Sequence, residues 1–156
     1  MSQAHFPGTR RILTHPPTVL LLLLVVQTGL ALMPSLRGDF PWSVQFLGGL
    51  LIIGGIALNI AATGRFQRHG TSVNPKAPPA SLVTSGVFAI SRNPMYLGIA
   101  MIMVGTSFAL RTPWALIVLP LYVAWITPLI RWEEQRLDAL FGGRYQSYQT
   151  RVRRWL

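Results

Sequence analysis

Long stretches without charge constrain this chain more than any other feature of its sequence. Residues 18–62 hold two charged side chains and residues 93–130 hold one, in a chain of 156 residues. Charged residues make up 12% of the chain, about half the proportion found in soluble domains. Such stretches could not be solvated, so they exclude the soluble nucleic-acid-binding domain that a net charge of +10 would otherwise suggest. The sequence predicts a small membrane protein with one domain, residues 1–156.

Four apolar segments have about the length that a helix needs to cross a bilayer, roughly 20 residues. Arg10 and Arg11 precede the first segment, as in a cleaved signal peptide, but no A-x-A pattern ends it and three more segments follow, so we favour a retained helix. The second segment is rich in glycine and alanine, which let membrane helices approach closely. We expect an all-α integral membrane protein with about four transmembrane helices, over residues 14–35, 42–62, 94–110 and 113–130.

The basic residues divide unequally between the two sides of such a protein. Twelve of the fourteen Lys and Arg residues lie in the N-terminus, the 64–93 loop or the 131–156 tail, whereas only Arg37 and Arg111 lie in the other connections. Because Lys and Arg are concentrated on the cytoplasmic side of membrane proteins, both termini are predicted to be cytoplasmic. The loop 64–93 and the tail 131–156 then meet on one face of the membrane.

Several kinds of site are excluded or not expected. The chain has no cysteine, which excludes disulfides, thiolate zinc sites and a cysteine nucleophile. Its three histidines, His5, His15 and His69, are far apart in sequence, so we expect no metal site. No Gly-x-Gly-x-x-Gly or P-loop pattern is present, and a Rossmann-type nucleotide site is therefore not expected.

The turn Arg92-Asn93-Pro94 marks the predicted start of the third membrane helix. Asn93 is a favourable N-cap residue, and Pro94 suits the first helical position. The free N–H groups and the positive dipole end of such a helix can bind a carboxylate or a phosphate, and Arg92 adds a cation. The alternative is an ordinary capped membrane helix with an interfacial arginine.

Three of the four acidic residues lie within six positions, directly after the last apolar segment, at Glu133, Glu134 and Asp138. On a helix, Glu133 would lie near the centre of an apolar face and Glu134 towards its edge. A carboxylate on an apolar face is costly unless it is paired or functional, so Glu133 is the stronger site candidate. The alternative is that Glu133 pairs with an arginine of the loop and only holds the tail in place.

The end of the chain has an apolar stripe among arginines. Tyr145, Tyr148, Val152 and Trp155 follow one another at helical spacing. This pattern predicts a C-terminal amphipathic helix at the membrane interface, lying on an anionic leaflet.

Together these motifs resemble the isoprenylcysteine carboxyl methyltransferase and phospholipid methyltransferase superfamily of integral membrane enzymes. The resemblance covers about residues 64–156, and the ending Val152-Arg153-Arg154-Trp155-Leu156 suits the bacterial branch, which implies a bacterial inner membrane. The matching motifs are Leu82-Val83-Thr84-Ser85-Gly86-Val87-Phe88, Arg92-Asn93-Pro94-Met95-Tyr96-Leu97-Gly98, Glu133-Glu134 and Phe141-Gly142-Gly143-Arg144-Tyr145-Gln146-Ser147-Tyr148.

The resemblance implies a methyltransferase that uses S-adenosylmethionine, with 64–93 and 131–156 as cytoplasmic cofactor-binding elements. The carboxylate of this cofactor suits the helix start and Arg92, while its ammonium and ribose hydroxyls both suit Glu133. The implied catalytic residues are Arg92, Asn93, Tyr96 and Glu133. The implied cofactor-binding residues are Leu82, Val83, Gly86, Phe88, Arg92, Asn93, Pro94, Met95, Tyr96, Glu133 and Glu134.

The chain departs from the family pattern at two positions. Asn93 stands where the eukaryotic enzymes have a histidine, so any proton-transfer role of that histidine is absent or filled by water. The isoprenylcysteine enzymes have a substrate-contacting arginine a little before the Glu pair. Leu129 occupies that spacing here, and Arg131 is the nearest substitute.

Methyl transfer from an activated sulfonium needs positioning and desolvation more than a strong acid or base, and this chain has no catalytic dyad. We expect a lipophilic acceptor within the bilayer, first a carboxylate and otherwise a phospholipid amine or a thiol. The competing class is a non-enzymatic four-helix membrane protein, such as a transporter subunit. A transporter should carry ionisable residues within its spans, and the four apolar segments have no Asp, Glu, Lys or Arg. The oligomeric state is left open.

Overall fold

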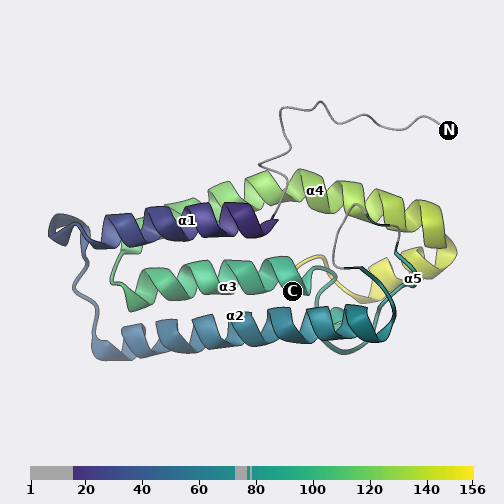
Figure 1. The fold of residues 1–156 in the computed structure, drawn as a ribbon, viewed down its shortest axis with the longest axis horizontal. Coiled ribbons are helices and arrows are strands. Elements are labelled where there is room, and N and C mark those ends of the chain that lie inside the picture. The colour runs from purple at the N-terminus through teal and green to yellow at the C-terminus, as the bar shows by residue number, and fades with distance from the viewer. Residues whose placement is uncertain (1–15, 73–76, 78) are drawn as a thin grey trace.

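The computed structural model describes residues 16–156 except 73–76 and 78, and this part of the chain contains helices and loops but no strand (Figure 1). The predicted all-α class is therefore confirmed. Arg10, Arg11, His5, His15 and the first two residues of the expected 14–35 helix lie outside the described residues, as does Lys76.

Helix α3 is central in the arrangement, because it contacts α1, α2 and α4 (Figure 1). The short helix α5 follows α4 directly and lies beside its C-terminal end. The bounds of the α-helices are α1 Pro16–Ala31, α2 Trp42–Arg68, α3 Pro94–Ala109, α4 Val118–Phe141 and α5 Gly143–Arg151, and those of the 3-10 turns are η2 Pro34–Leu36, η3 Gly86–Ala89 and η4 Pro113–Ile117.

Helix α2 is the one helix among the described residues that is long and apolar enough to cross a membrane. It has 27 residues and continues past the predicted end at residue 62. The apolar helices Leu22–Ala31 and Pro94–Ala109 are shorter. Length and composition thus support one membrane span, and the other three stay a prediction.

Helix α4 joins two segments that the sequence analysis treated as separate. The expected membrane helix 113–130 begins as the turn η4, and its α-helical part continues without a break to Phe141. The residues that follow position 130 include Glu, Gln, Arg and Leu, which favour helix. Gly142, with φ 51°, ends the helix. The first part of the tail 131–156 is therefore a rigid continuation of the apolar helix.

Glycine pairs bring α2 and α3 into close contact. A Cβ atom on Gly55 would lie 2.5 Å from the carbonyl oxygen of Gly98, and one on Gly105 would lie 2.6 Å from that of Gly48. The two pairs are seven residues apart on both helices, so the same close approach repeats after two turns. Small residues at such contacts let helix backbones pack where lipid supplies no hydrophobic drive.

Buried side chains hold the remaining helices against α3. Met103 of α3 packs in one apolar cluster with Tyr122, Ile126 and Ile130 of α4. Gln27 of α1 is fully buried, and its amide donates 3.1 Å hydrogen bonds to the Met103 carbonyl and the Ser107 hydroxyl. The outward faces of α1 and α2, in contrast, expose many large apolar side chains.

The two ends of the helical array differ in their charges. At one end the backbone N–H of Gly38 donates to the carbonyl of Arg111 at 2.7 Å, which joins the α1–α2 and α3–α4 connections. Most other described basic residues lie in the loop after α2, at the end of α4 or in the tail, at the opposite end (Figure 1). The loop and the tail therefore meet, as the sequence predicted.

Replacing Gly55 with alanine is expected to destabilise the protein by about 1–3 kcal/mol, the usual cost of overpacking, because the new methyl group would meet the Gly98 carbonyl. Thermal unfolding of the purified protein in detergent, followed by tryptophan fluorescence, measures the effect. Gly49→Ala is the matched control, since nothing lies within 4 Å of a Cβ there and alanine favours helix. Equal unfolding midpoints for the two variants would contradict the close helix contact.

Candidate active site

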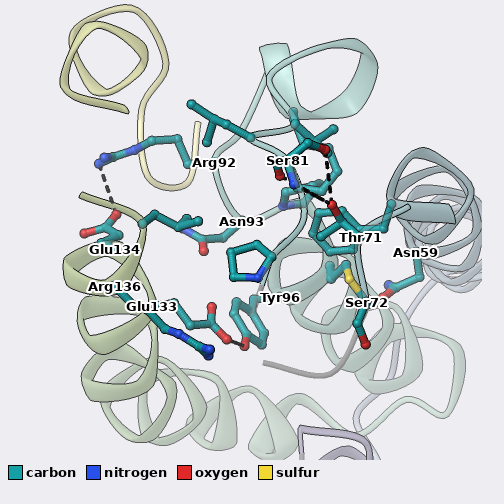
Figure 2. A pocket seen from close by; sticks show the side chains of 18 of the residues that line it. Asn59, Thr71, Ser72, Ser81, Arg92, Asn93, Tyr96, Glu133, Glu134 and Arg136 are labelled. Carbon is teal, nitrogen blue, oxygen red and sulfur yellow. Dashed lines mark hydrogen bonds and ion pairs between the residues drawn. The ribbon is translucent and has the colours of Figure 1, made fainter. Parts of the chain in front are cut away.

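A cavity of about 640 Å³ lies where α2 ends, α3 begins and α4 meets α5. Its volume falls within the range of roughly 300–1,000 Å³ that is typical of small-molecule sites. The wall is mostly apolar, and polar side chains from several elements converge on it (Figure 2). These polar side chains belong to Asn59, Thr71, Ser72, Ser81, Arg92, Asn93, Tyr96, Glu133, Glu134, Arg136, Tyr145 and Tyr148.

The turn before α3 is fixed by the C-terminal tail. Asn93 and Pro94 take the N-cap and first helical positions, as predicted. The Asn93 side chain makes no capping bond; instead its amide donates to the Arg154 carbonyl at 3.0 Å. The Ser91 hydroxyl donates to the same carbonyl at 3.2 Å. The helix therefore starts where it was predicted to start, and the asparagine side chain bonds to the tail and not to the free N–H groups of the helix.

Glu133 faces the cavity and is held by the tyrosine of the predicted motif. The Tyr96 hydroxyl donates to Glu133 Oε1 at 2.8 Å, and the Tyr122 hydroxyl donates to the Tyr96 carbonyl at 3.1 Å. Burial raises the pKa of the Glu133 carboxyl to about 7, although the Tyr96 hydrogen bond acts in the opposite direction. Near neutral pH this side chain therefore exists in both protonation states.

Glu134 is the acid that pairs with arginines. Its carboxylate lies 3.3 Å from Arg92 Nη2 and accepts two bonds from Arg154, from Nη2 at 2.7 Å and from Nε at 3.1 Å. From the sequence, the alternative was a pairing of Glu133 with a loop arginine; in the structure the pairing with the loop arginine Arg92 and with the tail belongs to Glu134.

Helix rotation explains why the sequence misplaced Glu134. The buried residues of α4 recur every fourth position, at Tyr122, Ile126, Ile130 and Glu134. This row places Glu134 on the inward face. Leu140, an apolar residue near the end of the same helix, is exposed and does not belong to this inward face.

Arg92 retains two donors for a ligand. Its side chain is 11% exposed, and its Nε and Nη1 atoms are buried without a hydrogen-bond partner among the described residues. Leaving buried donors of a charged group unsatisfied is costly. An anion in the cavity would remove this cost.

Helix α5 is shorter than predicted, and its stripe faces the protein. Tyr145, Tyr148 and Val152 are buried, and they pack with partly buried Leu82 and Leu137. The Tyr148 hydroxyl also donates to the Phe88 carbonyl at 2.6 Å. The helix ends at Arg151. The stripe thus packs against the protein rather than on a lipid leaflet, because the loop before α3 covers it.

Of the eleven predicted cofactor residues, ten line the cavity. The exception is Gly86. Its φ of 65° is a conformation that favours glycine, and the Arg65 guanidinium packs against this residue. Arg131, the expected substrate arginine, is exposed and does not line the cavity. The ten lining residues are Leu82, Val83, Phe88, Arg92, Asn93, Pro94, Met95, Tyr96, Glu133 and Glu134.

Sequence reasoning missed several polar residues of the wall. Arg136 lines the cavity beside Glu133 (Figure 2), and its guanidinium carbon lies 5.5 Å from the centroid of the Trp132 ring. Its position three residues after Glu133 on a helix was the available signal. Asn59 bonds within α2 to the Gly55 carbonyl at 2.9 Å and also lines the cavity.

The part of the chain that the structure describes combines helices, an apolar outer surface on α1 and α2 and a mixed polar cavity at one end, which is typical of a membrane-associated protein with a site for a small molecule. The chain belongs to the phospholipid methyltransferase family, whose model matches residues 43–144. Membership of a methyltransferase family was predicted from the motifs and is confirmed.

Relatives with assigned names agree with this membership. The chain is 32% identical over 138 residues to protein-S-isoprenylcysteine O-methyltransferase A of Arabidopsis thaliana, covering 86% of this chain and 68% of that protein. It is 32% identical over 115 residues to the B protein of the same plant, covering 71% and 58%. Its identity to the Saccharomyces cerevisiae protein-S-isoprenylcysteine O-methyltransferase is 36% over 73 residues, covering 46% and 30%. The chain thus spans between about a third and two thirds of these proteins.

The raised pKa of Glu133 predicts a pH-dependent stability. The folded state binds a proton more tightly than the unfolded state, whose carboxyl has the ordinary value of 4.5. Stability should therefore fall as pH rises from about 4.5 to 7, by at most roughly 3 kcal/mol. Unfolding midpoints between pH 4 and 8 measure this.

Glu133→Gln is expected to flatten that part of the profile. Tyr96→Phe removes a bond that lowers the folded-state pKa, so the fall should still begin near pH 4.5 but extend to higher pH than in the parent. A profile that is the same in Glu133→Gln as in the parent would contradict the assignment of the titration to Glu133.

Proposed function

We propose that this protein is an S-adenosylmethionine-dependent membrane methyltransferase that esterifies a lipophilic carboxylate. One observation carries the proposal: Arg92, whose Nε and Nη1 are buried without a hydrogen-bond partner among the described residues, and Glu133 line the same largely apolar cavity. A ligand that suits both must carry an anion and hydrogen-bond donors or a cation. S-adenosylmethionine has a carboxylate, an ammonium group and ribose hydroxyls.

The cavity residues fit this cofactor group by group. Arg92 would bind its carboxylate through a charge-assisted pair of hydrogen bonds, beside the start of α3 and the Asn93-Pro94 turn. Glu133, oriented by Tyr96, would accept hydrogen bonds from the ammonium or from the ribose hydroxyls. Leu82, Val83 and Phe88 line the same cavity and would flank the adenine.

The bound cofactor supplies an activated methyl group, whose transfer to a carboxylate oxygen of the acceptor breaks the sulfur–methyl bond and leaves S-adenosylhomocysteine. The protein side chains need neither donate nor remove a proton in that reaction. Their work is to hold the acceptor in line and to exclude water, which favours attack by a desolvated oxygen. An asparagine at position 93 is therefore compatible with the reaction.

The acceptor is proposed to come from the lipid side. Ile56 and Ile60 of α2 line the cavity and are also exposed at the outer surface. An isoprenyl or acyl chain could lie against them with its carboxylate in the cavity. The names of the Arabidopsis and yeast relatives, which are isoprenylcysteine O-methyltransferases, support a lipidated carboxylate.

Arg136 is the proposed partner of the acceptor carboxylate. It lines the cavity beside Glu133, whereas Arg131, which the sequence favoured, is exposed outside it. A fixed guanidinium matches the two oxygens of a carboxylate.

The proposed membrane arrangement has the four spans predicted from the sequence, 14–35, 42–62, 94–110 and 113–130, in the bilayer and both termini in the cytoplasm, with a bacterial inner membrane as the location. The support is the unequal distribution of basic residues between the two ends and the apolar outer surface of α1 and α2. The cavity then opens at the cytoplasmic interface, where a soluble cofactor and a lipid acceptor can meet.

A phospholipid amine is the second candidate acceptor, and the name of the matching family model favours it. Labelled methyl transfer from S-adenosylmethionine by the purified protein separates the candidates. We expect label in N-acetyl-S-farnesylcysteine and none in its amide, which lacks the carboxylate. Label in phosphatidylethanolamine vesicles instead would overturn the carboxylate assignment, and failure to bind S-adenosylhomocysteine by calorimetry would overturn the cofactor assignment.

Arg136→Gln is expected to raise the KM for N-acetyl-S-farnesylcysteine by about tenfold or more, because a charge-assisted bond to the carboxylate is lost. The KM for S-adenosylmethionine should change little. Arg131→Gln removes the same charge from the same helix and serves as the matched control. If Arg131→Gln raises the KM for N-acetyl-S-farnesylcysteine and Arg136→Gln does not, the acceptor carboxylate binds Arg131, the arginine first predicted from the sequence.

A further inference from the structure

Arg92, Glu134 and Arg154 form a three-membered charge cluster at the edge of the cavity. Glu134 forms ion pairs with both Arg92 and Arg154. Its side chain is 10% exposed. One negative charge thus faces two positive charges, and the cluster retains one net positive charge.

The two arginines share this carboxylate unequally. Arg154 bonds both oxygens, Oε2 from Nη2 at 2.7 Å and Oε1 from Nε at 3.1 Å. Arg92 approaches with Nη2 alone, at 3.3 Å, and its Nε and Nη1 stay buried without a hydrogen-bond partner among the described residues. A planar guanidinium that grips both oxygens makes the stronger pair, so Glu134 is neutralised mainly by Arg154.

We propose that Arg154 is a positioning residue that neutralises Glu134 and thereby leaves the Arg92 guanidinium available to bind the carboxylate of the methyl donor. This inference rests on the proposed function and deepens it. Without Arg154, Glu134 would have Arg92 as its remaining cation in the cluster. Arg92 would then turn towards both oxygens of Glu134, and its charge would be cancelled before a ligand arrived.

The backbone of the tail allows the side-chain role to be tested on its own. The main-chain carbonyl of Arg154 accepts the bonds from Ser91 and Asn93, and that of Arg153 accepts a bond from the Arg92 N–H at 3.0 Å. A substitution at position 154 keeps these carbonyls. It therefore changes the charge of the cluster and leaves the attachment of the tail in place.

The test is calorimetric binding of S-adenosylhomocysteine to the purified full chain in detergent. Arg154→Gln is expected to weaken binding about tenfold, because the charge that faces the ligand carboxylate is lost. The double variant Glu134→Gln, Arg154→Gln should recover most of that loss, since the competing acid is gone. Arg154→Lys, which keeps the charge, should bind more tightly than Arg154→Gln. Arg153→Gln, which removes an exposed arginine from the same tail, should bind like the parent.

Decarboxylated S-adenosylhomocysteine separates this role from a purely structural one. Its affinity should be the same for the parent and for Arg154→Gln. Equal losses with both ligands, or no recovery in the double variant, would overturn the inference and leave Arg154 as a tail anchor. If the parent binds S-adenosylhomocysteine but Arg154→Gln binds it equally well, the inference fails and the proposed function stands. A parent protein that binds neither ligand would instead count against the proposed function.

Discussion

The arrangement of the site depends on one buried carboxylate that two arginines share. Glu134 belongs to α4, Arg92 to the turn before α3, and Arg154 to the C-terminal tail. Burying a carboxylate without partners is costly, so these ion pairs favour the arrangement in which the three segments meet. The cavity is the space that they enclose with the end of α2. Removing one member of this ion-paired cluster would leave an uncompensated charge where the three elements meet.

Two kinds of interaction stabilise different parts of the molecule. In the apolar part, α2 and α3 approach through glycine pairs such as Gly55 and Gly98, and the burial of Met103 and Ile126 holds α4. At the site end, hydrogen bonds and ion pairs replace this packing. The tail is attached through the Arg154 carbonyl as well as through its guanidinium. The site therefore rests on an apolar frame but takes its own geometry from polar contacts.

Much of the fold could be read from the sequence, because apolar stretches and the Asn93-Pro94 boundary act locally. The grouping of the ordered motifs around one cavity was also predictable, although it came from the resemblance rather than from periodicity. The roles of Glu133 and Glu134 were not predictable, because a rotation of one position along α4 decides which acid meets the arginines. Arg136 was missed for a related reason: whether a helical arginine faces a cavity or solvent depends on what packs against the helix. The prediction that the apolar stripe of the tail lies on lipid was wrong, because an amphipathic face indicates burial without saying whether lipid or protein covers it.

The continuity of α4 links the site to its surroundings mechanically. Ile126, Ile130 and Glu134 lie on one unbroken helical row, so the acid cannot change its depth unless the apolar turns move with it. In a bilayer, the thickness of the hydrocarbon layer influences how such a helix tilts and how far it protrudes. In the proposed membrane arrangement, acyl-chain length would then act on the ion-paired cluster through α4, and lipid composition would become part of the geometry in which the cavity is assembled.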